Sequence, residues 1–263
     1  MKHDTRKTAV DVLMIVTYIL MITMNALANL LPLNGQNTGE ISDNYANLFA
    51  PAGFTFSIWS VIYVLLALHI LYQLGLFRSN TKSNDQLLTQ IGIYFSLSSV
   101  LNAIWIIAWH YDQLLLSVFI MILLLVTLIR INQLTATAKL SPKESFFIKL
   151  PFSIYFGWIT VATIANITAY LVSIGWDGFG LSKATWTIII LIVGTIIGVL
   201  TMLTLHNAAY GLALIWAYYG IYSKHTSVTG FNNEYPAIIT TVLICIVVFA
   251  ATMIFVLLRQ SRK

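Results

Sequence analysis

The residues of this sequence that could do chemistry are uncharged: tryptophans and asparagines at helical spacing within apolar stretches. Asn102 and Trp105 are three residues apart, and Trp158, Ala162 and Asn166 follow one another at intervals of four. Residues three or four apart share one face of a helix. Aromatic walls with a few polar groups are typical of a pocket for a flat, mostly apolar ligand. Simple packing between helices is the alternative interpretation of the same stripes.

Sequence motifs of enzymes and metal sites are missing. The chain contains no HExxH, GxSxG or CxxC motif and no glycine-rich phosphate loop. Its single cysteine, Cys245, lies in an apolar run and offers neither a disulfide nor a metal-ligand spacing. We therefore predict no catalytic residue and no metal site, and these motifs leave the question of a cofactor open. An enzyme that acts on a bound pigment or lipid is disfavoured for the same reason.

The elements that must position these stripes are membrane-spanning helices. Of the 263 residues, 59% are hydrophobic and only 9% are charged, whereas a soluble domain has about 25% charged residues. That supply is too small to cover a water-facing surface. The composition excludes a soluble enzyme and a disordered chain, and the clustering of the charges between apolar runs argues against a nucleic-acid partner. The sequence predicts an all-α, polytopic integral membrane protein whose first partner is the lipid bilayer.

Eight stretches are long and apolar enough to cross a bilayer, which takes about 20 residues. Residues 184–222 form one run, interrupted only by His206 and Asn207, that is too long for a single span. We expect a tight turn at these two residues and hence two helices. The eight expected spans are 9–32, 54–76, 87–109, 113–131, 147–173, 184–205, 208–222 and 236–258.

The basic residues orient these spans. If the N-terminus is cytoplasmic, the inner segments hold all of the 14 lysines and arginines except Lys183 and Lys224. Both termini are then cytoplasmic, and we expect an integral protein of a bacterial plasma membrane. The inner basic residues are Lys2, Arg6, Lys7, Arg78, Lys82, Arg130, Lys139, Lys143, Lys149, Arg259, Arg262 and Lys263.

Three other features predict contacts. The loop over residues 33–53 begins polar and ends apolar, so its second half should fold back onto the protein. Gly194 and Gly198 form a small-xxx-small pattern that predicts close helix packing, with a neighbouring span or with a second subunit in a homodimer. Three tryptophans near span ends are expected to be interfacial anchors: Trp109, Trp176 and Trp186.

Three segments of the chain resemble the TspO/translocator protein family, also called tryptophan-rich sensory proteins. Residues 51–63, PAGFTFSIWSVIY, are similar to the family's P-P-G-W-V-F-x-x-x-W-x-x-x-Y, with Phe54 in place of a tryptophan. Residues 101–105, LNAIW, match L-N-x-x-W. Trp158, Ala162 and Asn166 match W-x3-A-x3-N, although Pro151 lies three residues further away than in the family's pattern.

The resemblance implies a fold and a set of ligand-binding residues. It covers residues 9–173 and implies a TspO-like five-helix membrane domain at residues 1–175. Residues 176–263 would then be a three-helix C-terminal membrane extension. The ligand-binding residues that the resemblance implies are Phe54, Phe56, Trp59, Tyr63, Asn102, Trp105, Trp158, Ala162 and Asn166.

The function that the resemblance implies is the binding of a flat hydrophobic small molecule, porphyrin-like (a tetrapyrrole) or sterol-like, in a sensory or transport role. A structural or regulatory membrane subunit, whose aromatic stripes only pack helices, is the alternative. A pigment- or lipid-modifying membrane enzyme is the third hypothesis.

Overall fold

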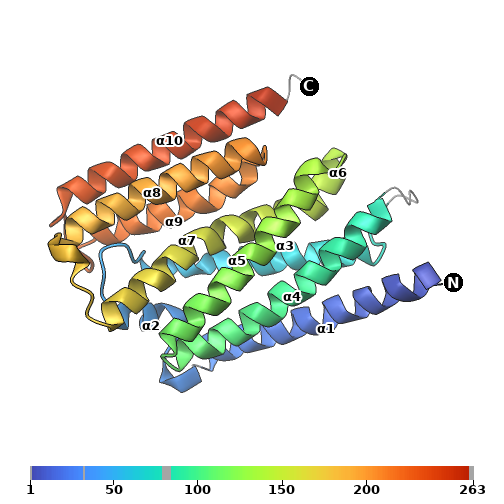
Figure 1. The fold of residues 1–263 in the computed structure, drawn as a ribbon, viewed down its shortest axis with the longest axis horizontal. Coiled ribbons are helices and arrows are strands. Elements are labelled where there is room, and N and C mark those ends of the chain that lie inside the picture. The colour runs from blue at the N-terminus through green and yellow to red at the C-terminus, as the bar shows by residue number, and fades with distance from the viewer. Residues whose placement is uncertain (1, 32, 79–83, 261–263) are drawn as a thin grey trace. The chain divides into compact units, whose positions relative to one another are not determined.

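The computed structural model describes residues 2–31, 33–78 and 84–260, and this part of the chain is helical without a strand. Eight helices of 16 residues or more occur in it, one at each expected span (Figure 1). They are α1 (Lys2–Leu30), α3 (Ile58–Gln73), α4 (Asp85–His110), α5 (Leu114–Thr137), α7 (Leu150–Ser173), α8 (Lys183–Thr204), α9 (Ala208–Thr226) and α10 (Pro236–Gln260).

Shorter elements join these helices. The first long loop forms η1 (Leu33–Gly35), α2 (Thr38–Asn44) and η2 (Gly53–Ser57). The helix that contains α7 begins with α6 (Pro142–Glu144) and a π-helical turn, η4 (Ser145–Lys149). Ser141 and Glu144 cap its start reciprocally. The 3₁₀ turn η5 (Gly178–Gly180) lies between α7 and α8.

Seven helical segments in the described ranges are long and apolar enough to cross a membrane, and α9 is not among them. The expected turn at His206–Asn207 is confirmed, because α8 ends at Thr204 and α9 begins at Ala208. The Asn207 side chain caps α9 by accepting from the Tyr210 N–H. The 19 residues of α9 would span about 28 Å at 1.5 Å per residue. The crossing of the membrane by α9, and with it the orientation of both termini, stays a prediction. Three of the basic residues used to orient the spans lie outside the described residues: Lys82, Arg262 and Lys263.

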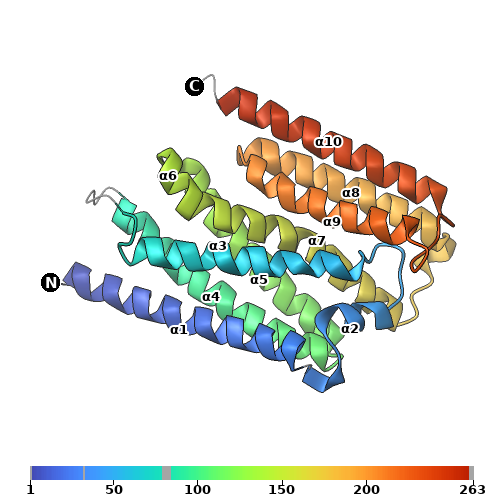
Figure 2. The same ribbon diagram turned by 180° about the vertical axis from the view of Figure 1, so that it is seen from behind.

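The chain divides into two compact units. The first comprises Met1–Asn37 and Trp59–Phe156, and within it α1, α4 and α5 run side by side (Figures 1 and 2). Helix α4 contacts both α1 and α5. The core holds large apolar side chains that are fully buried, among them Ile91, Phe95 and Leu124. The Tyr18 hydroxyl donates to the Tyr63 carbonyl at 2.9 Å and so links α1 to α3.

The second unit comprises Thr38–Ile58 and Gly157–Lys263. Here α10 contacts both α8 and α9, and the three helices run side by side (Figures 1 and 2). The small-xxx-small pattern packs within the chain. A Cβ on Gly194 would lie 2.7 Å from the Tyr218 hydroxyl, and one on Gly198 would lie 2.5 Å from Leu214 Cδ1. Both glycines therefore pack against a neighbouring helix of the same chain, α9.

The apolar half of the long loop is buried in the second unit, as expected. Leu48, Phe49 and Ala50 are buried, and backbone and side-chain bonds fix this segment to α9. The Ala52 N–H donates to the Gly220 carbonyl at 3.0 Å. A ring nitrogen of His225 lies 2.9 Å from the Leu48 carbonyl oxygen.

Candidate functional site

Four of the predicted ligand-binding residues gather in the first unit. Trp59 and Tyr63 stack with ring centroids 5.5 Å apart, because four residues of helix place them one turn apart on α3. Trp59 also faces Trp105 of α4, at 6.3 Å between centroids, and contacts Tyr155 of α7 edge-on at 5.8 Å. Asn102 lies on the same face of α4 as Trp105, and both are buried.

Asn102 is the polar centre of this aromatic cluster. Its side-chain oxygen accepts from Asn25 of α1 at 2.7 Å, and its amide nitrogen donates to the Tyr155 hydroxyl at 3.1 Å. Three helices therefore meet through one buried side chain. Such a bond between membrane helices is worth about 1 kcal/mol. The interaction holds the helix faces in register beside the aromatic rings.

Two polar atoms of the cluster are buried without a hydrogen-bond partner: Nε1 of Trp105 and the hydroxyl oxygen of Tyr63. Buried polar groups in proteins are nearly always paired, and leaving one unpaired costs about 1–3 kcal/mol. Both groups belong to residues that the sequence predicts as ligand contacts. Trp105 can donate one hydrogen bond, and Tyr63 can donate or accept one. The cluster therefore offers polar atoms to a guest in an otherwise aromatic setting.

The other five predicted residues belong to the second unit. The rings of Phe56 and Trp158 meet edge-to-face at 5.9 Å. Ala162 and Asn166 follow Trp158 along α7, and Asn166 is buried. Phe54 makes a separate edge-on contact with Trp216 of α9 at 5.6 Å. Within this unit the predicted residues therefore fall into two groups. Phe56 joins the three residues of α7, whereas Phe54 packs separately against α9.

Sequence reasoning missed two members of the first cluster. Tyr155 is fully buried and bridges Asn102 and Trp59, although the resemblance did not include it. Its position three residues before Trp158, on the same expected helix, was the available signal. Trp109, expected to be an interfacial anchor, is instead buried and stacks on Trp105 at 6.0 Å.

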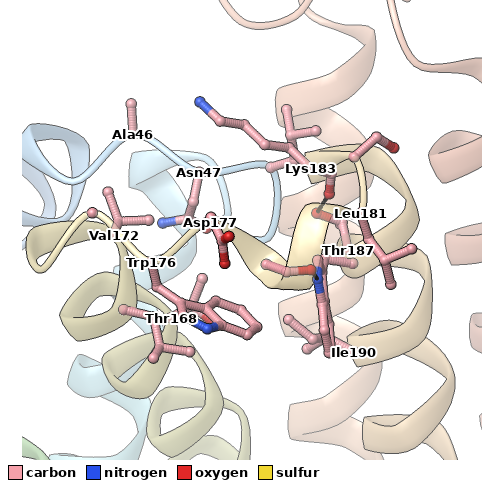
Figure 3. Close-up of a pocket in the computed structure, with 16 residues that line it drawn as sticks. Ala46, Asn47, Thr168, Val172, Trp176, Asp177, Leu181, Lys183, Thr187 and Ile190 are labelled. Atoms are coloured by element: carbon pink, nitrogen blue, oxygen red, sulfur yellow. Dashed lines mark hydrogen bonds between the residues drawn. The ribbon is translucent and has the colours of Figure 1, made fainter.

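The second unit also holds a cavity of about 510 Å³. It lies between the end of α7, the start of α8 and the segment 46–48 (Figure 3). We call it the α7–α8 cavity. Trp176 and Trp186, the other two expected anchors, both line it. Among the residues that the structure describes, no group of three or more His, Cys, Asp or Glu side chains could hold a metal ion.

The fold and the aromatic cluster define a class: a polytopic α-helical membrane protein with tryptophan- and asparagine-lined helix faces. The sequence model of one family, described as TSPO-like protein, matches residues 11–255. The chain therefore belongs to the TSPO-like family, and membership indicates an integral membrane protein with a ligand-binding or sensory role. The matched range includes α8 and α9 and most of α10. Comparison with curated proteins gave no match, and neither did comparison with solved structures.

Proposed function

We propose that the protein binds a flat, mostly apolar molecule of the tetrapyrrole or sterol class and serves a sensory or transport role. In the first unit the ligand would lie against the rings of Trp59 and Trp105, with the Tyr63 hydroxyl and the Trp105 indole N–H as its polar contacts and Asn102 beside them. The observation that carries the proposal is the pair of unpartnered polar atoms, on Trp105 and Tyr63, inside an aromatic cluster. A guest with a few polar groups would pair with these atoms and bury its faces against the rings.

A structural membrane subunit is the second candidate, and one observation favours it. The aromatic rings already contact one another, and Asn102 is already bonded to both Asn25 and Tyr155. Both features would stabilise a helix bundle without any ligand. Binding a planar ligand between the rings would therefore require them to separate.

The experiment is a titration of the purified full-length protein in detergent with a free-base porphyrin, followed by the porphyrin absorbance band. We expect saturable binding. Trp105→Ala should weaken it by about 1–2 kcal/mol, roughly five- to thirty-fold in Kd, through lost aromatic contact and burial. Trp186→Ala, a tryptophan outside the cluster, should leave Kd within about twofold. A competing sterol distinguishes the two ligand classes.

Trp158→Ala tests the residues implied by the resemblance in the second unit. If Trp158 contacts the ligand, its truncation should also raise the porphyrin Kd by about five- to thirty-fold. No saturable binding by the unmodified protein, or equal effects from Trp105→Ala and Trp186→Ala, would contradict the proposal and favour the structural subunit.

A further inference from the structure

The α7–α8 cavity lies where two membrane-spanning helices end. Helix α7 ends at Ser173 and α8 begins at Lys183, and the cavity is lined by residues on both sides of this connection. Its volume of about 510 Å³ lies within the range of small-molecule pockets, about 300–1,000 Å³. Helix ends of this kind meet the headgroup layer, where tryptophans concentrate. A ligand of this cavity would therefore be reached from the membrane–water interface.

The cavity is a built feature, because hydrogen bonds fix its walls. The indole N–H of Trp186 donates to the Gly178 carbonyl at 2.5 Å, and the Asp177 carboxylate accepts from the Phe179 N–H at 3.0 Å. Gly178 has φ +67°, and a Cβ there would lie 2.7 Å from the Trp186 ring. A side chain at position 178 would therefore displace this wall. The Trp176 and Trp186 rings lie 5.0 Å apart, tilted by 55°.

The charged side chains of the lining gather at one end of the cavity, and the rest of the lining is uncharged. Figure 3 shows Asp177 and Lys183 at the end near Asn47, whereas Thr168 and Ile190 lie further along α7 and α8. The remaining apolar lining comes from side chains of both helices and the two loops, including Leu48, Leu171, Val172 and Leu181. An occupant with a polar head at the charged end and an apolar body along the two helices matches this lining.

The charges of the cavity cancel. Asp177 and Lys183 are its two charged lining residues, and neither forms a salt bridge with another described residue. Lys183 is the first residue of α8, so the helix N-terminus adds to its attraction for an anion. Asp177 attracts a cation, and the adjacent Trp176 ring offers a cation–π contact. An occupant with one charge of each sign satisfies both side chains, whereas a simple anion would meet the Asp177 carboxylate.

We propose that the α7–α8 cavity binds the headgroup of one zwitterionic phospholipid that carries a phosphate and a primary ammonium. The phosphate pairs with Lys183 and the start of α8. The ammonium pairs with Asp177 and the face of Trp176. The acyl part lies against Val172 and Ile190. A phospholipid is preferred to a soluble zwitterion because the apolar lining would otherwise face water.

The test is native mass spectrometry of the full-length protein, titrated in detergent with phosphatidylethanolamine, phosphatidylglycerol or glycerophosphoethanolamine. We expect one molecule of phosphatidylethanolamine to bind at least about fivefold more tightly than phosphatidylglycerol, the scale of one charged or cation–π contact. Glycerophosphoethanolamine has the headgroup but no tails and should bind far more weakly. Asp177→Asn keeps the acceptor for the Phe179 N–H and should remove the preference between the two lipids. Lys183→Gln should weaken both.

Matched controls separate this site from the aromatic cluster. Lys139→Gln removes an exposed lysine outside the cavity and should leave lipid binding unchanged. Trp105→Ala should also leave it unchanged, whereas Trp176→Leu should reduce the affinity for phosphatidylethanolamine about fivefold. Equal binding of the two lipids by the unmodified protein would overturn the proposal. So would an unchanged lipid preference in Asp177→Asn, or equally tight binding of the tailless headgroup. None of these outcomes depends on porphyrin binding.

Discussion

Asn102 joins three helices through its two hydrogen bonds, so its side chain affects stability as well as the aromatic cluster. Its oxygen is bonded to Asn25 and its nitrogen to Tyr155, and all three side chains are buried. Asn25 keeps a second acceptor, because its amide also donates to the Met21 carbonyl within α1. Without Asn102 the Tyr155 hydroxyl would therefore lose its hydrogen-bond partner, whereas the Asn25 amide would keep one acceptor.

We expect Asn102→Leu to lower the free energy of unfolding by about 1 kcal/mol, the typical value of a side-chain bond between membrane helices. The substitution keeps the side-chain volume close to native and removes both bonds. Thermal unfolding in detergent measures the change. Asn29→Ala is the comparison, because the Asn29 amide donates to Asn25 within its own helix and should cost less. A larger loss in Asn29→Ala would contradict the role assigned to Asn102.

At the scale of elements, α9 is the packed centre of the second unit. Its residues Tyr210 and Tyr218 are fully buried, and the Tyr210 hydroxyl donates to the Thr160 hydroxyl of α7 at 3.0 Å. Glycine allows α7 to approach this helix. A Cβ on Gly157 would lie 2.5 Å from the Tyr210 carbonyl oxygen and 2.8 Å from the Ala213 Cβ.

Gly157→Ala should therefore destabilise the protein, although alanine is the better helix former by about 1 kcal/mol. The added methyl group meets backbone, which cannot move without separating α7 from α9. We expect a loss of about 1–3 kcal/mol, the usual cost of overpacking, seen as a lower Tm. Gly53→Ala is the control, because a Cβ there meets nothing within 4 Å. Equal Tm values for the two variants would contradict this close packing.

The attachment of the long loop to α9 should depend on pH. His225 lies beyond the expected span of α9, and burial of its ring lowers its pKa below the ordinary 6.5, opposed by the hydrogen bond to Leu48 and aided by the Lys224 charge. Protonation is thus less favourable in the folded state than in the unfolded chain. Neutral His225 therefore contributes its full stabilisation of the folded protein above pH 6.5. This contribution is lost as the pH falls from 6.5 through the lowered pKa.

The measurement is Tm between pH 5 and pH 8. The unmodified protein should lose Tm below about pH 6.5, the unperturbed pKa of histidine. His225→Gln should reduce the dependence of Tm on pH in this range. His206→Asn replaces a histidine at the other end of α9, where φ is +48° and asparagine is tolerated, and is the matched substitution for comparison. A slope that is unchanged in His225→Gln would assign the pH dependence to another group.

At the scale of the whole molecule, the number of crossings decides the topology. Within the described part of the chain, seven helices qualify by length and composition. If α9 also crosses, the α9–α10 loop is external and the C-terminus is cytoplasmic. We expect a cysteine at Val228, which is 83% exposed, to react with an impermeant thiol reagent in intact cells. A cysteine at Lys143 should react only after permeabilisation. Both variants are made in a Cys245→Ala background, and the reverse labelling pattern would contradict the eight-span topology.

The sequence by itself determined the class of protein and the positions of its helices. Charge scarcity excludes a water-facing surface, and the length of the apolar runs sets the spans, because both depend on local composition alone. The turn at His206–Asn207 was predictable for the same reason. The family followed from the spacing of Asn102, Trp105, Trp158 and Asn166, which is also local.

Tertiary structure decided which side chains meet, because contacts between helices depend on rotation and approach that no single stretch encodes. Packing buried Trp109 against Trp105, where its position at a span end had predicted an anchor. It brought Tyr155 to Asn102 across 53 residues of chain. It also placed Trp176 and Trp186 around a cavity with Asp177 and Lys183, where the connection between α7 and α8 turns at Gly178 and accepts a hydrogen bond from the Trp186 indole. From local composition alone, these four residues are identified only as the ends of two spans, and their grouping around one cavity is not.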